Sequence, residues 1–66
     1  MKHNHKAVKI DCIDLTLLVD EEELVLAYRM ASSNIPCNSM PLNHPGLMTG
    51  LLSCRQPDVL RWEIRF

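Results

Sequence analysis

Three cysteines and one histidine have the ligand types of a structural zinc site. They are Cys12, Cys37, His44 and Cys54, and a Cys₃His set can hold zinc tetrahedrally. Such sites usually present their ligands in pairs separated by about two to four residues, and none of these four residues is paired in this way. We therefore expect no metal here and three separate cysteines that are buried as small apolar side chains.

The cysteine count also bears on the cellular compartment. An odd number of cysteines at wide spacing differs from a small disulfide scaffold, which carries an even number. The sequence therefore predicts free thiols and a reducing compartment. It contains no run of about 18 apolar residues, so it predicts no membrane-spanning helix. We expect a soluble, cytoplasmic protein that does not bind membranes.

The amino end offers a different metal chemistry. In Met1-Lys2-His3, a free amine, two backbone amides and the His3 imidazole can surround Cu(II) or Ni(II) in a square plane, with His5 close by. Any chain with histidine at its third position can do this. We expect residues 1–6 to be a flexible polar tail, and we keep copper or nickel binding by His3 and His5 as an alternative function.

A catalytic pair can be drawn from Cys37 as the nucleophile and His44 as the base. Nothing in the sequence supplies the third, orienting group or an oxyanion site. The chain also has only two glycines and little volume for a pocket. The sequence therefore predicts neither an enzyme nor a bound cofactor.

Three arginines favour a nucleic-acid alternative. Arg55, Arg61 and Arg65 lie in or near the last predicted strand and could contact the phosphates of a single strand. However, Glu63 lies between two of them, and the chain has a formal net charge of −1. A solvated strand face is the better interpretation of this pattern.

The length and composition predict one small folded domain. The chain has 66 residues, of which 47% are hydrophobic and 23% charged, which is typical of globular proteins. A chain of this length buries only about 60% of the surface that its unfolded form exposes, and it is only marginally stable alone. We expect one α+β domain over residues 7–66 that gains stability from a partner.

The first predicted strand changes its apolar face partway along residues 7–19. Val8, Ile10 and Cys12 alternate on one face, whereas Ile13, Leu15, Leu17 and Val19 alternate on the other. Such a change requires a bulge, expected near residues 12–13, or a strand that is covered on both faces. The second option requires a partner subunit.

A helix is predicted over residues 21–33. Asp20 is a good N-cap, and Glu23 follows three residues later, as in a capping box. Asn34 suits the left-handed position after the helix, and Pro36 prevents continuation.

The second half of the chain is harder to interpret. Residues 34–46 contain three of the four prolines and predict a long loop, with a turn at Pro45-Gly46. Residues 48–54 fit either a helix or a strand, whereas residues 59–66 alternate strictly and predict a strand. We expect a βαββ fold, one helix on a three-stranded antiparallel sheet, with βααβ as the alternative.

These features favour a protein that works by binding another protein. The two-faced strand, the apolar loop and the small core would all be covered by a second chain, most simply in a homodimer. We expect a regulator, inhibitor or complex subunit. The predicted contact residues are Met40, Leu42 and His44 in the loop and Glu21 and Glu22 at the helix start, the acids mainly raising the association rate.

Overall fold

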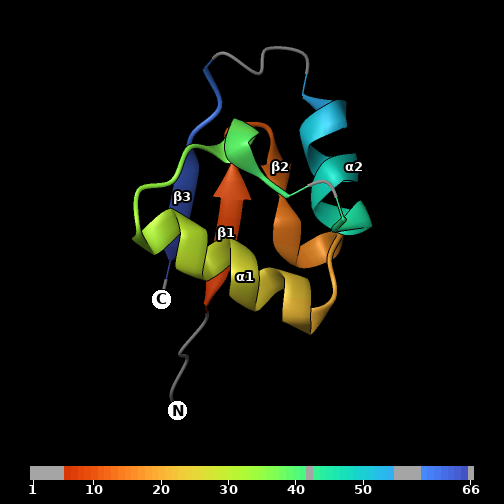
Figure 1. Ribbon diagram of the computed structural model, residues 1–66, viewed down its shortest axis with the longest axis horizontal. Helices are drawn as coiled ribbons and strands as arrows, with labels where there is room; N and C mark the ends of the chain where they lie inside the picture. The colour runs from red at the N-terminus through yellow and green to blue at the C-terminus, as the bar shows by residue number, and fades with distance from the viewer. Residues whose placement is uncertain (1–5, 42, 55–58, 66) are drawn as a thin grey trace.

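The computed structural model describes residues 6–41, 43–54 and 59–65. Its strands and helices form an α+β architecture with a three-stranded antiparallel sheet in the order β2-β1-β3 (Figure 1). The elements in chain order are β1 (Ala7–Ile10), β2 (Ile13–Asp14), the short 3₁₀ turn η1 (Leu15–Leu17), α1 (Glu21–Ser32), the 3₁₀ turn η2 (Cys37–Ser39), α2 (Pro45–Ser53) and β3 (Trp62–Arg65). Within the described residues, no helix is long and apolar enough to cross a membrane.

A tight turn at Asp11 and Cys12 explains the change of apolar face in the first segment. The chain reverses there, and Ile10 of β1 pairs with Ile13 of β2. The expected bulge in one long strand is therefore wrong, because the segment forms a hairpin instead. No strand needs cover on both faces, so this reason for a partner subunit no longer holds.

The last strand confirms the strict alternation of the sequence. In β3, Trp62 and Ile64 are partly buried toward the core, whereas Glu63 and Arg65 are exposed. The strand pairs antiparallel with β1 in a register that places Ile64 opposite Val8. The first and last strands thus lie side by side in the sheet.

Helix α1 forms as the sequence predicts. Asp20 and Glu23 make the capping box, and the helix ends at Ser32. Asn34 adopts a left-handed conformation with φ of 62°, and the Ile35 N–H donates to the Met30 carbonyl at 3.0 Å. This bond is typical of a Schellman motif.

Residues 45–53 form a helix, so the predicted hairpin of residues 48–54 with 59–66 is wrong, and so is the turn at Pro45-Gly46. Proline suits the first position of a helix because its missing N–H is not needed there. The two glycines allow close packing: a Cβ on Gly46 would meet the Glu23 carboxylate and the Leu18 carbonyl, and one on Gly50 would meet a Leu15 methyl. The βαββ order is thus replaced by two strands, two helices and a final strand.

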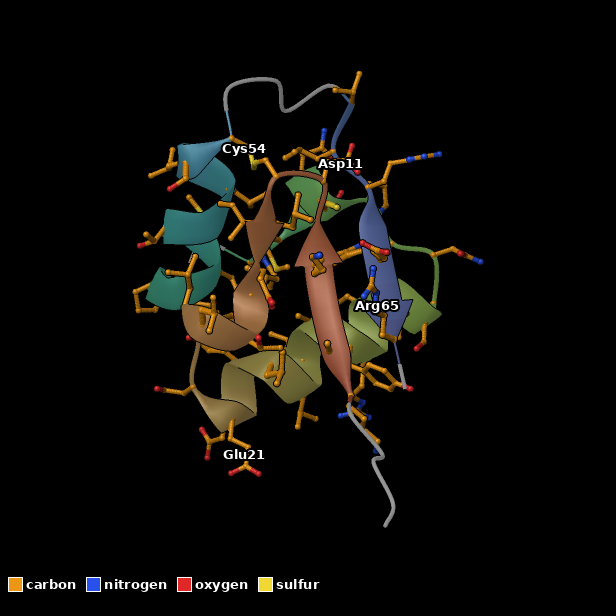
Figure 2. The ribbon with its side chains drawn as sticks, turned by 180° about the vertical axis from the view of Figure 1, so that it is seen from behind. Asp11, Glu21, Cys54 and Arg65 are labelled. Atoms are coloured by element: carbon orange, nitrogen blue, oxygen red, sulfur yellow. A yellow bond between two sulfur atoms is a disulfide. The ribbon has the colours of Figure 1, made fainter. Side chains whose placement is uncertain are left out.

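One face of the sheet is covered and the other is open. Helix α1 crosses the covered face, and α2 lies beside β2 (Figure 1). Figure 2 shows the opposite face, with the strands in front and Arg65 on it. The open face is polar, because Lys9, Glu63 and Arg65 alternate with the core residues. The buried core consists of Val8, Ile10, Leu15, Ala27, Met30, Ala31, Cys37, Met40, Leu47 and Cys54.

Candidate interaction site along the edge of β3

In the described part of the chain, strand β3 lies at one edge of the sheet, because only β1 neighbours it. Among the described residues, no backbone hydrogen bond outside the β1–β3 ladder involves residues 59–65. The outer side of β3 therefore presents unpaired backbone donors and acceptors. Such an edge is a template on which another extended chain can pair.

The register shows which residues direct these groups outward. The pair that closes a two-residue hairpin turns its backbone groups toward each other, so those of Ile10 face β2. Backbone groups alternate in direction along an antiparallel strand, so those of Lys9 face β3 and its partner Glu63. By the same alternation, Trp62 and Ile64 direct their N–H and C=O groups to the free edge.

A groove runs beside this edge. It has a volume of about 460 Å³ and lies between β3 with its preceding residues and the segment that follows α1. Its lining residues are Ala31, Asn34, Ile35, Pro36, Cys37, Leu60, Arg61, Trp62 and Ile64. The groove thus combines apolar side chains with a free strand edge, the two features needed to receive an extended peptide.

Two contacts fix the shape of the groove. The Trp62 indole N–H donates to the Ile35 carbonyl and joins β3 to the segment after α1. The Schellman bond from Ile35 to Met30 fixes the other end of that segment. The groove walls are therefore held before any partner binds, which lowers the entropic cost of binding.

Charges alternate in sign on the open face next to the edge. The Glu63 carboxylate accepts from Arg65 Nη2 at 2.9 Å and lies 4.0 Å from Lys9 Nζ. The hydrogen bond and charge of Arg65 lower the pKa of Glu63, so this carboxylate is ionised. Arg61 is exposed, and among the described residues no ion pair joins it to an acid.

The structure describes four of the five contact residues that the sequence predicts. Met40 is buried in the core, which removes it from any contact surface. His44 precedes α2 and lies 4.0 Å from the Glu23 carboxylate. Glu21 and Glu22 are exposed in the first turn of α1. Leu42 lies outside the described residues, and a partner surface shared by the loop and helix residues stays a prediction.

The cysteines do not behave as predicted. Cys12 and Cys54 form a disulfide with a Cα–Cα distance of 6.1 Å, joining the β1–β2 turn to the end of α2 (Figure 2). Sequence spacing could not reveal this pair, because 42 residues separate the two cysteines and only the hairpin brings them together. The expectation of three free thiols is wrong. A zinc site of Cys12, Cys37, His44 and Cys54 is also excluded while this bond is intact.

Cys37 is a core residue and not an activated thiol. Its side chain is 1% exposed, and burial raises the pKa of its thiol to about 11. A nucleophilic cysteine needs a lowered pKa. Among the described residues, no cluster of histidines, cysteines and acids could hold a metal. Three residues of the alternative functions, His3, His5 and Arg55, lie outside the described ranges.

Comparison with known proteins gives no functional lead. No protein family, no curated protein and no solved structure matches the chain. The function is therefore inferred from the geometry of β3 and its groove.

Proposed function

We propose that the protein is a small non-enzymatic interaction module that binds an extended protein segment along the free edge of β3. One observation carries this proposal: in the described structure, an unpaired strand edge lies beside a preformed groove whose lining is both polar and apolar. The predicted role as a regulator, inhibitor or complex subunit fits such a site. Its contact residues move from the predicted loop to residues 60–64 and 34–37.

The free edge of β3 and the groove beside it contribute differently to binding. The backbone groups of Trp62 and Ile64 would pair with the incoming strand, each net hydrogen bond contributing about 1 kcal/mol. Every second side chain of that strand would enter the groove against Ile35 and Leu60. Arg61, which is exposed and forms no ion pair with any acid that the structure describes, would select an acidic residue next to the apolar one.

The disulfide changes the expected location. The cytoplasmic prediction depended on three free thiols, and two of them are joined. Disulfides persist in oxidising compartments and are rare in the cytosol. We therefore place the working form of the protein in a compartment where the Cys12–Cys54 bond forms.

The nucleic-acid alternative has less support. Arg65 binds Glu63 of the same strand, and Lys9 lies near the same carboxylate. The charges on the open face therefore offset one another and form no continuous basic track, which single-strand binding requires.

The test uses a random peptide library displayed on phage as the source of extended segments. Panning against the oxidised protein is expected to select peptides with an apolar residue next to an acidic one. Their binding is expected to shift the NMR signals of residues 60–65 and 34–37. Peptides that instead shift signals at the exposed Leu17, Leu18 and Leu52 would overturn the proposal.

A backbone variant provides the matched control. Cys54 is a natural ligation junction, so residues 54–66 can be made synthetically with a methyl group on the Ile64 amide nitrogen. This change leaves every side chain intact and blocks only the edge. We expect at least about tenfold weaker peptide binding, because an edge hydrogen bond is lost and the methyl group obstructs pairing. Unchanged affinity would contradict edge binding.

A further inference from the structure

We infer that the segment which pairs with β3 is the β3 strand of a second copy, in an antiparallel arrangement about a two-fold axis. This inference depends on the proposed function, because it uses the same free edge. It names the partner, and it makes the sheet continuous across two subunits. The support comes from the symmetry of the strand and the sequence of its charges.

Symmetry allows few registers for such a pair. A two-fold axis perpendicular to the sheet keeps each face of one copy on the same side as that face of the other. Residues directly opposite each other in antiparallel strands also lie on the same face. The axis must therefore pass between a residue of one copy and the same residue of the other copy, which lie directly opposite each other. Within Trp62–Arg65, the central choices are Glu63 and Ile64.

The charges distinguish these two registers. An axis at Glu63 would place the two Glu63 carboxylates opposite each other and Arg61 opposite the partner's Arg65. Both pairs repel. An axis at Ile64 places Glu63 opposite the partner's Arg65 twice, and Ile64 opposite the partner's Ile64. The alternating charges of β3 are therefore complementary to their own reversed copy in one central register.

The backbone directions fit the same register. Ile64 directs its N–H and C=O groups outward, so the two copies of Ile64 form a hydrogen-bonded pair on the axis. Glu63 and the partner's Arg65 then occupy a non-hydrogen-bonded position, where opposed side chains approach most closely. Each Glu63 already binds Arg65 of its own strand at 2.9 Å. The four side chains would form a ring of alternating charge on the open face.

The apolar face supports the pairing as well. Ile64 lines the groove beside Ile35 and Pro36, so the partner's Ile64 would lie at the mouth of this groove. The grooves of the two copies would lie on opposite sides of the two-fold axis. The open faces of the two sheets would form one continuous surface across it. The joint sheet would have the order β2-β1-β3 in one copy followed by the reverse order in the other.

The test measures dimerisation by sedimentation equilibrium of the oxidised protein over a range of concentrations. The unmodified chain is expected to approach twice its monomer mass as its concentration rises. Glu63→Arg is expected to weaken the dimer about tenfold, because two attractive pairs become repulsive. The double variant Glu63→Arg with Arg65→Glu restores both pairs and is expected to restore the dimer.

A matched variant has the same composition and net charge as the double variant Glu63→Arg with Arg65→Glu. In Glu63→Arg with Arg61→Glu, the attractive pairs of the proposed register remain broken, so the dimer is expected to stay weak. Recovery in this variant together with failure of the first double variant would overturn the register. Circular dichroism and unfolding of each variant confirm that the comparison is between folded chains.

The results for self-pairing and for edge binding are separable. A protein that stays monomeric at all concentrations up to about 1 mM would overturn the homodimer. A dissociation constant of that size corresponds to a binding free energy of roughly 4 kcal/mol. The selected peptides and the N-methylated Ile64 chain then still test the edge site by themselves. Conversely, a dimer that survives N-methylation of Ile64 would overturn self-pairing at this edge, and the test of peptide binding there would still stand.

Discussion

The Glu23 carboxylate accepts a hydrogen bond from the Gly46 backbone N–H at 3.2 Å, across 23 residues of sequence. Its other oxygen accepts from the Asp20 N–H at 3.4 Å, which closes the capping box of α1. One side chain therefore satisfies donors at the first turns of both helices. Because unsatisfied N–H groups at helix starts are costly, this contact fixes α2 relative to α1.

Gly46 is the residue that allows this contact, and we expect Gly46→Ala to destabilise the fold by about 2 kcal/mol. The added Cβ would overlap the Glu23 carboxylate and lie 3.0 Å from the Leu18 carbonyl oxygen, which is backbone and cannot rotate away. Gly50→Ala is the matched control. Its Cβ meets only side chains, nearest at 2.8 Å from Leu15 Cδ2, and alanine improves helix propensity by about 1 kcal/mol. Urea unfolding measures both, and equal losses would contradict this explanation.

Glu23→Ala is expected to lower the free energy of unfolding by about 1 to 2 kcal/mol, because two backbone donors lose their acceptor. Glu22→Ala is the control. Glu22 is an exposed acid in the same turn of α1, so its removal is expected to cost less than about 0.5 kcal/mol. Thermal and urea unfolding should show this difference. A Glu22 variant as unstable as the Glu23 variant would show that helix charge, and not the shared cap, matters.

The Cys12–Cys54 disulfide is expected to contribute about 4 kcal/mol, from the entropy of closing a loop of this length. The variant Cys12→Ser with Cys54→Ser should therefore unfold at a much lower urea concentration. Thiol titration of the unreduced, denatured protein should find one free thiol, that of Cys37. Finding three free thiols in protein from its native source would contradict the bond.

The stability should also fall at alkaline pH because of Cys37. Its folded pKa is about 11, against an ordinary value of 9.0. A raised pKa means that this thiol contributes stability below pH 9 and that the contribution is lost as the pH rises from 9 toward 11. Urea unfolding across this range should show a steeper decline for the wild-type chain than for Cys37→Ala. Parallel declines would show that other groups cause the loss.

Local signals in the sequence predicted the elements that depend on neighbouring residues. The Asp20–Glu23 box, the left-handed Asn34 and the alternation of β3 each act over a few residues. They therefore identify α1 and β3 without knowledge of the fold.

The errors arose where distant residues decide the structure. Glycine ordinarily weakens a helix, but α2 needs Gly46 and Gly50 because Glu23, Leu18 and Leu15 pack closely against it. The disulfide and the groove similarly join segments far apart in sequence. Pairwise proximity of this kind leaves no periodic pattern in a single sequence, so the sequence predicted the strand β3 but not the candidate site beside it.

The most direct test of the central claim is hydrogen exchange at the individual backbone amides of β3, measured by NMR. In dilute protein, the Ile64 amide faces solvent and is expected to exchange quickly, whereas the Glu63 and Arg65 amides are protected by β1. Raising the protein concentration, or adding a selected peptide, is expected to protect Ile64 about tenfold or more as the edge becomes paired. Dimerisation or peptide binding that leaves Ile64 exchange unchanged would contradict strand pairing at this edge.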